Sequence, residues 1–148
     1  MENRIIIASD ISGVIKDLTS ENFIENSIES LTELSNSFNI IFISKCKESY
    51  QLKLKQWLLE NNLNHFKCKF CLDYKDKNQI AINENVSIMI DDKIQVLSKM
   101  NDNIIKIWFC DDNKRINGAK MFQPEIFNRI HLARNWNDAS NLINSLIN

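Results

Sequence analysis

The chain has 148 residues, of which 44% are hydrophobic and 25% are charged. These proportions are typical of a folded globular protein, and the length predicts a single domain over residues 1–148. The formal net charge of −1 argues against a protein that wraps duplex nucleic acid by overall positive charge. No apolar run approaches the ~20 residues of a membrane span, and no signal peptide precedes the first apolar segment, so we expect a cytoplasmic protein without a membrane partner.

The first half of the chain alternates short apolar runs with helical patterns. Residues 4–9 and 38–43 are rich in isoleucine and predict buried strands. Residues 21–37 and 47–62 carry apolar side chains at three- and four-residue spacing, which predicts amphipathic helices. Ser20 is the expected N-cap of the first of these helices.

The second half of the chain continues this alternation. It predicts a weaker strand at 65–70, a strand at 86–90, a helix at 92–100, a strand at 104–109, a weaker strand at 129–133 and a helix at 136–147. Asn137 is the expected cap of the last helix. Strands and helices that alternate at this spacing form right-handed βαβ units, so we expect an α/β fold with a doubly wound parallel sheet and helices on both faces.

Polar residues follow three of the predicted strands at the point where each strand ends. Asp10 follows the first strand and Ser44 follows the second. Asp91 and Asp92 follow the strand at 86–90. Because doubly wound sheets bind ligands at the carboxyl ends of their strands, we expect these side chains to share one site.

The three aspartates of this group predict a metal site. Two like charges ~4 Å apart repel by about 4 kcal/mol at an effective dielectric of about 20, and a hard cation removes that penalty. Oxygen ligands of this kind suit Mg²⁺. In an alternative interpretation, Asp91 caps the following helix and Asp92 lies in its first turn. The presence of Asp10 at an equivalent strand end favours the metal site.

The ordered set of motifs resembles that of the haloacid dehalogenase-like phosphohydrolases. The first motif of that family, an apolar strand and D-x-D-G-[TV], is similar to residues 5–14, which read IIIASDISGV. The second, an apolar strand that ends in Ser or Thr, matches Ser44. The fourth, an apolar strand that ends in Asp-Asp, matches residues 88–92. Residues 74–77 are similar to the deoxyribonucleotidase branch, and residues 91–96 resemble polynucleotide 3′-phosphatases.

This resemblance implies a Rossmann-like core and a Mg²⁺-dependent phosphatase that works through an aspartyl-phosphate. Asp10 would attack phosphorus. Mg²⁺ would be held by Asp10, the Ser12 carbonyl and a motif-four aspartate, with Asp92 the first choice and Asp91 in support.

The resemblance also implies how the phosphate is bound. The Ser44 hydroxyl would donate a hydrogen bond to a phosphate oxygen, and a lysine would balance the developing charge. Lys77 is the expected lysine because it follows Asp76 as in the nucleotidase pattern, and Lys75 is the alternative. Gly13 would let the backbone turn sharply beside the phosphate.

One position departs from the family pattern. The second aspartate of the first motif, which protonates the leaving group in the family, is Ser12 in this chain. Loss of a general acid or base typically costs 10²–10⁴-fold in rate. Substrates with good leaving groups would suit such a site better than alkyl phosphates. The alternative function is a catalytically impaired domain that binds phosphate or a protein partner.

Too few residues separate the motifs to hold the inserted cap domain that closes many members of the family. A capless, open site suits a large phosphorylated substrate, such as a nucleotide, a nucleic-acid end or a phosphoprotein, or a site completed by a second subunit. Basic residues that follow strands or lie in loops predict a local anion-attracting face at the same edge. These are Lys45, Lys47, Lys75, Lys77, Lys93, Lys114 and Arg115. A receiver-like signalling domain is disfavoured, because its acidic pair ends the first strand.

Overall fold

The computed structural model describes residues 4–147 and contains a single sheet of six parallel strands among them. The strands are β1 (Ile6–Ser9), β2 (Asn39–Lys45), β3 (Lys67–Cys71), β4 (Ile88–Asp91), β5 (Ile105–Phe109) and β6 (Ile130–Ala133). They lie in the order β3-β2-β1-β4-β5-β6. All six predicted strands are confirmed, including the two weaker ones, and so is the doubly wound, Rossmann-like α/β fold.

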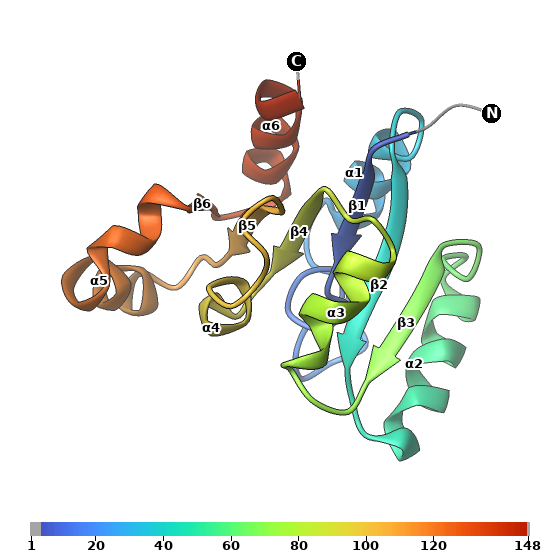
Figure 1. Ribbon diagram of the computed structural model, residues 1–148. Helices are drawn as coiled ribbons and strands as arrows, with labels where there is room; N and C mark the ends of the chain where they lie inside the picture. The colour runs from blue at the N-terminus through green and yellow to red at the C-terminus, as the bar shows by residue number, and fades with distance from the viewer. Residues whose placement is uncertain (1–3, 148) are drawn as a thin grey trace.

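Helices connect the strands and cover the sheet (Figure 1). They are α1 (Ser27–Leu34), α2 (Glu48–Glu60), α3 (Asp76–Asn83), α4 (Ile94–Leu97), α5 (Asn113–Phe122) and α6 (Trp136–Ile147), with a short 3₁₀ helix at Pro124–Asn128. Figure 1 shows α3 in front of the strands and α1 behind them. None of the helices in residues 4–147 is both long enough and apolar enough to cross a bilayer.

Two apolar cores fill the space between the sheet and its helices. Alternate residues of each strand face opposite sides, so Ile7 joins one core and Ala8 joins the other. The first core contains side chains of α1, α2 and α6, including Leu31, Trp57 and Trp136. The second contains side chains of α3, α4 and α5. Helices on both faces explain why the strands are continuous apolar runs rather than alternating ones.

Strand order reverses at β1, which pairs with β2 on one side and with β4 on the other. The connections that follow β1 and β4 therefore run in opposite directions along the sheet. In doubly wound sheets, ligands bind beyond the carboxyl ends of the two strands at such a point. This topological switch point is where Asp10 follows β1 and Asp91 ends β4.

The segment between β1 and α1 folds as a short flap, so the predicted helix 21–37 is too long. Lys16 pairs with Phe23 in an antiparallel bridge, and α1 begins only at Ser27. Ser20 is not the N-cap: its hydroxyl donates to Asp17 at 2.9 Å within the flap, and Asn26 occupies the cap position. Within residues 4–147, no domain is inserted between the strands, in agreement with the capless prediction.

Three smaller features differ from the sequence prediction. Helices α3 and α5 were not predicted from the sequence. Few of their residues are apolar and buried, so the sequence there lacks the apolar spacing that indicates a helix. The predicted helix 92–100 is reduced to α4. Asn137 lies inside α6, and the amide oxygen of Asn135 instead accepts a hydrogen bond from the backbone N–H of Asp138.

Candidate active site

Three aspartates meet at the switch point of the sheet. Asp10 is 5% exposed, Asp91 is fully buried and Asp92 is 4% exposed. One oxygen from each lies within 4.8 Å of the others. The backbone N–H of Asp10 donates to the carbonyl of Ile90, which fixes the end of β1 beside the end of β4. The sequence prediction that these carboxylates converge is therefore confirmed.

Lys77 is the buried cation of this cluster. Its Nζ lies 2.8 Å from Asp91 Oδ2 and 3.4 Å from Asp10 Oδ2. Burial alone would lower the pKa of Lys77, but the two carboxylates outweigh burial and raise its pKa above the usual value. Lys75, the alternative lysine, has a side chain that is 79% exposed and lies near Asp73 instead. The structure thus brings Lys77 into the cluster and leaves Lys75 outside it.

Lys77 does not balance the cluster completely, since three carboxylates face this one buried ammonium group, and Lys93, which is partly exposed, lies 3.9 Å from Asp92 Oδ2. Burial and the neighbouring Asp91 carboxylate raise the pKa of Asp10 from 3.8 to about 8, although Lys77 acts in the opposite direction. Burial and Asp91 also raise the pKa of Asp92. The site is therefore short of positive charge, which is the condition that favours a bound cation.

The donor atoms of the cluster fit Mg²⁺. Among the described residues, Asp92 Oδ1 is the one buried side-chain nitrogen or oxygen without a hydrogen-bond partner. Such an orphaned carboxylate oxygen is costly unless a cation binds it. Asp91 is already engaged, because Oδ2 binds Lys77 and Oδ1 accepts the backbone N–H of Lys93 at 2.9 Å. Asp10 is engaged too, because Oδ1 accepts the backbone N–H of Ile11 at 2.8 Å and Oδ2 lies 3.4 Å from Lys77 Nζ. Asp92 is thus the best candidate ligand, and Asp10 and Asp91 both hold Lys77.

Ser12 and Gly13 shape the loop that follows Asp10. Ser12 pairs with Lys16 in an isolated bridge, and the Gly13 N–H donates to the Lys16 carbonyl at 2.8 Å. Gly13 has a φ of 88°, a backbone conformation that residues with a Cβ atom rarely adopt. This tight turn brings the backbone at Gly13 against the Asp92 side chain. The role of the Ser12 carbonyl as a metal ligand stays a prediction.

Ser44 completes the row of polar residues at the sheet edge. It lies in β2, two residues beyond Phe42, whose partner in β1 is Ser9. Ser44 is 2% exposed. Its position in the register places it level with the start of the Asp10 loop, as the strand-end argument predicted.

Trp108 and Arg115 hold the backbone of Asp92, a feature that the sequence did not predict. The indole Nε1 of Trp108 donates to the Asp92 carbonyl at 3.1 Å, and Arg115 Nη2 donates to the same oxygen at 2.7 Å. Trp108 is buried, as predicted for a core residue, and it pairs with Asp91 across β4 and β5. Arg115 was expected only as part of a basic face. Neither contact follows from local sequence spacing.

A hollow of about 310 Å³ lies beside the cluster, between the flap and the loops after β5 and β6. Gly13 and Asp92 line it. Its other lining residues are Leu18, Ile24, Glu25, Phe109, Cys110, Asp111, Asp112, Arg115, Arg134 and Asn135. Of the carboxylate cluster only Asp92 lines this hollow, so it offers room for a bound ligand beside Asp92, on the side that faces the flap.

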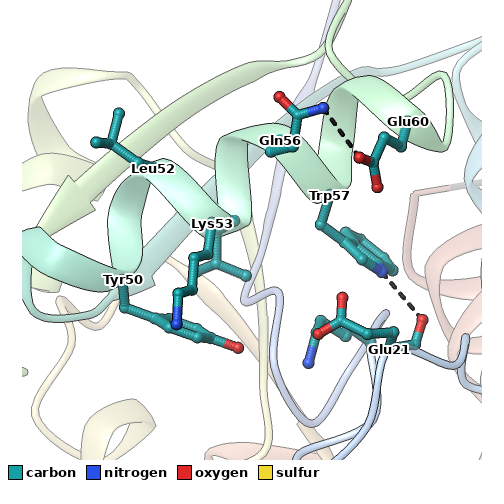
Figure 2. A pocket seen from close by; sticks show the side chains of 9 residues that line it. Glu21, Tyr50, Leu52, Lys53, Gln56, Trp57 and Glu60 are labelled. Atoms are coloured by element: carbon teal, nitrogen blue, oxygen red, sulfur yellow. Dashed lines mark hydrogen bonds between the residues drawn. The ribbon is translucent and has the colours of Figure 1, made fainter.

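A separate cavity of about 380 Å³ lies between the flap and α2 (Figure 2). Trp57 closes one end, and its Nε1 donates to the Glu21 carbonyl at 3.0 Å. Tyr50 and Lys53 also line it. None of its lining residues belongs to the carboxylate cluster, so this cavity is not the candidate site. The hydrogen bond from Trp57 to Glu21 fastens the flap to α2.

Two comparisons of the sequence with known proteins identified no relative. A scan against protein-family models found no match, and a search of curated proteins found no similar sequence. The function is therefore inferred from the residues of the site.

Proposed function

We propose that this protein is a Mg²⁺-dependent phosphohydrolase of the haloacid dehalogenase type that works through an aspartyl-phosphate on Asp10. The observation that supports this best is the buried cluster of Asp10, Asp92 and Lys77 at the switch point of a parallel sheet, with an orphaned oxygen on Asp92. The order of the motifs along the chain agrees with it.

Each residue has a physical role in this proposal. Asp10 donates an electron pair from a carboxylate oxygen to phosphorus, and the bond from phosphorus to the leaving oxygen breaks. Lys77 holds Asp10 in place and lowers the charge that opposes its approach to an anion. The Ser44 hydroxyl donates to a phosphate oxygen. Mg²⁺ bound by Asp10 and Asp92 would neutralise phosphate charge as a Lewis acid.

Water must then attack phosphorus to release Asp10, and a proton must move away from that water. Because Ser12 replaces the carboxylate that takes this proton in the family, the proton would pass to an oxygen of the released phosphate or to solvent. The same carboxylate protonates the leaving group in the first step, so the proposal favours substrates whose leaving groups depart without protonation. Activated phosphates, such as acyl phosphates and aryl esters, belong to this class. The open hollow beside Asp92 suits a leaving group that extends out of the site.

Hydrolysis of p-nitrophenyl phosphate with and without Mg²⁺ tests the proposal. We expect turnover that depends on Mg²⁺ and is lost in Asp10→Asn. Binding of Mg²⁺ and phosphate without turnover of any activated ester would support the alternative, a phosphate-binding domain that is silent because of Ser12.

A further inference from the structure

Three lysines from three different segments surround the ring of Tyr74. Lys45 ends β2, Lys77 lies in α3 and Lys93 follows the aspartate pair. Their Nζ atoms lie 4.7 Å, 6.0 Å and 5.7 Å, respectively, from the ring centroid. Tyr74 is 39% exposed, so this group opens to solvent directly beside the buried carboxylates. An aromatic ring attracts ammonium groups without cancelling their charge.

The three lysines differ in how far carboxylates already neutralise them. Lys77 is committed to Asp91 and Asp10. Lys93 Nζ is 3.9 Å from Asp92 Oδ2, a long contact, and its side chain is 28% exposed. Lys45 forms no ion pair with any carboxylate in residues 4–147. Two ammonium groups therefore remain available to an anion that comes from outside the protein.

Lys45 and Lys93 lie beside the position expected for the reacting phosphate and not at that position. The reacting phosphate would lie against Asp10, Ser44 and Lys77. Lys45 directly follows Ser44 and Lys93 directly follows Asp92, so both flank that position from neighbouring strand ends. Ammonium groups are compact donors that bind phosphate as point charges. A second anionic group on the same ligand would meet them.

We propose that Lys45 and Lys93, gathered by Tyr74, bind a second phosphate group, so that the preferred ligand is a phosphomonoester that carries another phosphate nearby. A nucleoside bisphosphate and a phosphorylated end of a nucleic-acid strand both have this chemistry. The inference rests on the proposed function for the position of the reacting phosphate. It adds a specificity subsite that the catalytic steps do not use.

The test measures binding without turnover. In the Asp10→Asn protein with saturating Mg²⁺, calorimetry compares adenosine 3′,5′-bisphosphate with the two adenosine monophosphates. We expect the bisphosphate to bind about tenfold more tightly than either monophosphate, since a charge-assisted contact typically contributes this much. The preference should disappear when Lys45→Gln and Lys93→Gln are combined. Lys55→Gln is the matched control, because Lys55 lies 5.8 Å from the Phe70 ring, outside this group.

Equal affinities for the bisphosphate and the monophosphates would overturn the inference, as would a preference that survives both substitutions. A trinucleotide with a terminal 3′-phosphate distinguishes the two sources: tighter binding than the bisphosphate assigns the subsite to a strand end, and weaker binding assigns it to a small nucleotide. Absence of p-nitrophenyl phosphate hydrolysis by the wild type would instead overturn the proposed function, and this separate measurement keeps the two failures distinct.

Discussion

A Cβ atom at position 13 would lie 2.5 Å from Oδ2 of Asp92 and 2.8 Å from its Cγ. Real Cβ atoms do not approach other atoms so closely, and Gly13 also has a positive φ. The glycine of the first motif is therefore required by the aspartate of the fourth, although 79 positions separate them along the chain (92 − 13). The turn after β1 and the Asp92 side chain form one packed unit.

Gly13→Ala should damage this unit. A non-glycine residue in this conformation costs about 1–3 kcal/mol, and the new methyl group must displace the Asp92 carboxylate. We expect a lower melting temperature and no stabilisation by millimolar Mg²⁺. The wild type should gain about 2.7 kcal/mol at a hundredfold excess of Mg²⁺ over its Kd.

Gly118→Ala provides the matched control for this substitution. Gly118 lies in α5, and a Cβ at this position would meet no neighbouring atom within 4 Å, so alanine should be neutral or stabilise by up to about 1 kcal/mol. Its response to Mg²⁺ should equal that of the wild type. A Gly13→Ala protein with an unchanged response to Mg²⁺ would contradict the placement of the metal at Asp92.

Lys77→Met should destabilise the protein strongly. The substitution leaves the Asp10 and Asp91 carboxylates buried without their cation, and breaking a buried pair in this way typically costs about 3–5 kcal/mol. Lys75→Met, at an exposed side chain, should change the free energy of unfolding by less than about 0.5 kcal/mol. Urea unfolding of both variants measures the difference.

If Lys77→Met does not fold, the double variant with Asp91→Asn distinguishes the cause. Removal of one unpaired carboxylate should restore part of the lost stability. Equal stability of the Lys77→Met and Lys75→Met proteins would show that Lys77 is not the cation on which the cluster depends.

The stability of the metal-free protein should depend on pH through Asp10. The pKa of Asp10 is about 8 in the folded protein against 3.8 for an ordinary aspartate, so the folded state binds this proton more tightly. Its stabilising effect is complete below about pH 3.8 and is lost as pH rises through about 8. We therefore expect wild-type stability to fall relative to Asp10→Asn between about pH 4 and about pH 8.

Chemical unfolding of both proteins in a chelator, over this range of pH, measures the effect. Saturating Mg²⁺ should reduce the dependence, because a cation favours the ionised carboxylate. A stability difference that stays constant with pH would mean that Asp10 is ionised throughout.

The sequence predicted the sheet well because its signal is local. Isoleucine-rich runs such as 38–43 are apolar at consecutive positions, which indicates a strand that is buried on both faces of a parallel sheet. Three of the predicted strands are followed by polar residues. The same rule located the carboxylates of Asp10 and Asp91. The spacing of apolar side chains wrongly predicted that the first helix begins at residue 21. The bridge between Lys16 and Phe23 holds this part of the chain in the flap, so the helix begins only at Ser27.

Long-range contacts account for what the sequence could not predict. The choice of Lys77 over Lys75 came from the family pattern, and only the burial of Lys77 in the structure separates the two physically. Trp108 and Arg115 bind a backbone carbonyl, an interaction that leaves no residue-type signal near Asp92. The gathering of lysines around Tyr74 likewise joins segments that are distant along the chain.

Ser12→Asp should change which substrates are hydrolysed. A carboxylate at this position restores a group that can protonate a leaving alkoxide, so turnover of alkyl phosphates should rise about 10²-fold or more. Turnover of p-nitrophenyl phosphate should rise much less, because its leaving group needs little protonation. The assay needs saturating Mg²⁺, since the new carboxylate adds negative charge to the cluster.

The comparison of kcat/KM for the two substrate classes gives the answer. The wild type should strongly prefer the activated ester. Equal rates on both classes in the wild type would mean that a residue other than Ser12 already supplies the proton.

The most direct test of the proposed mechanism is chemical trapping of the intermediate on Asp10. The protein is incubated with Mg²⁺ and p-nitrophenyl phosphate, quenched with acid and reduced with borohydride, which converts an aspartyl-phosphate to homoserine. We expect peptide mass spectrometry to find homoserine at position 10 only when both Mg²⁺ and substrate are present. Turnover with Asp10 unmodified, or turnover retained in Asp10→Asn, would contradict the mechanism.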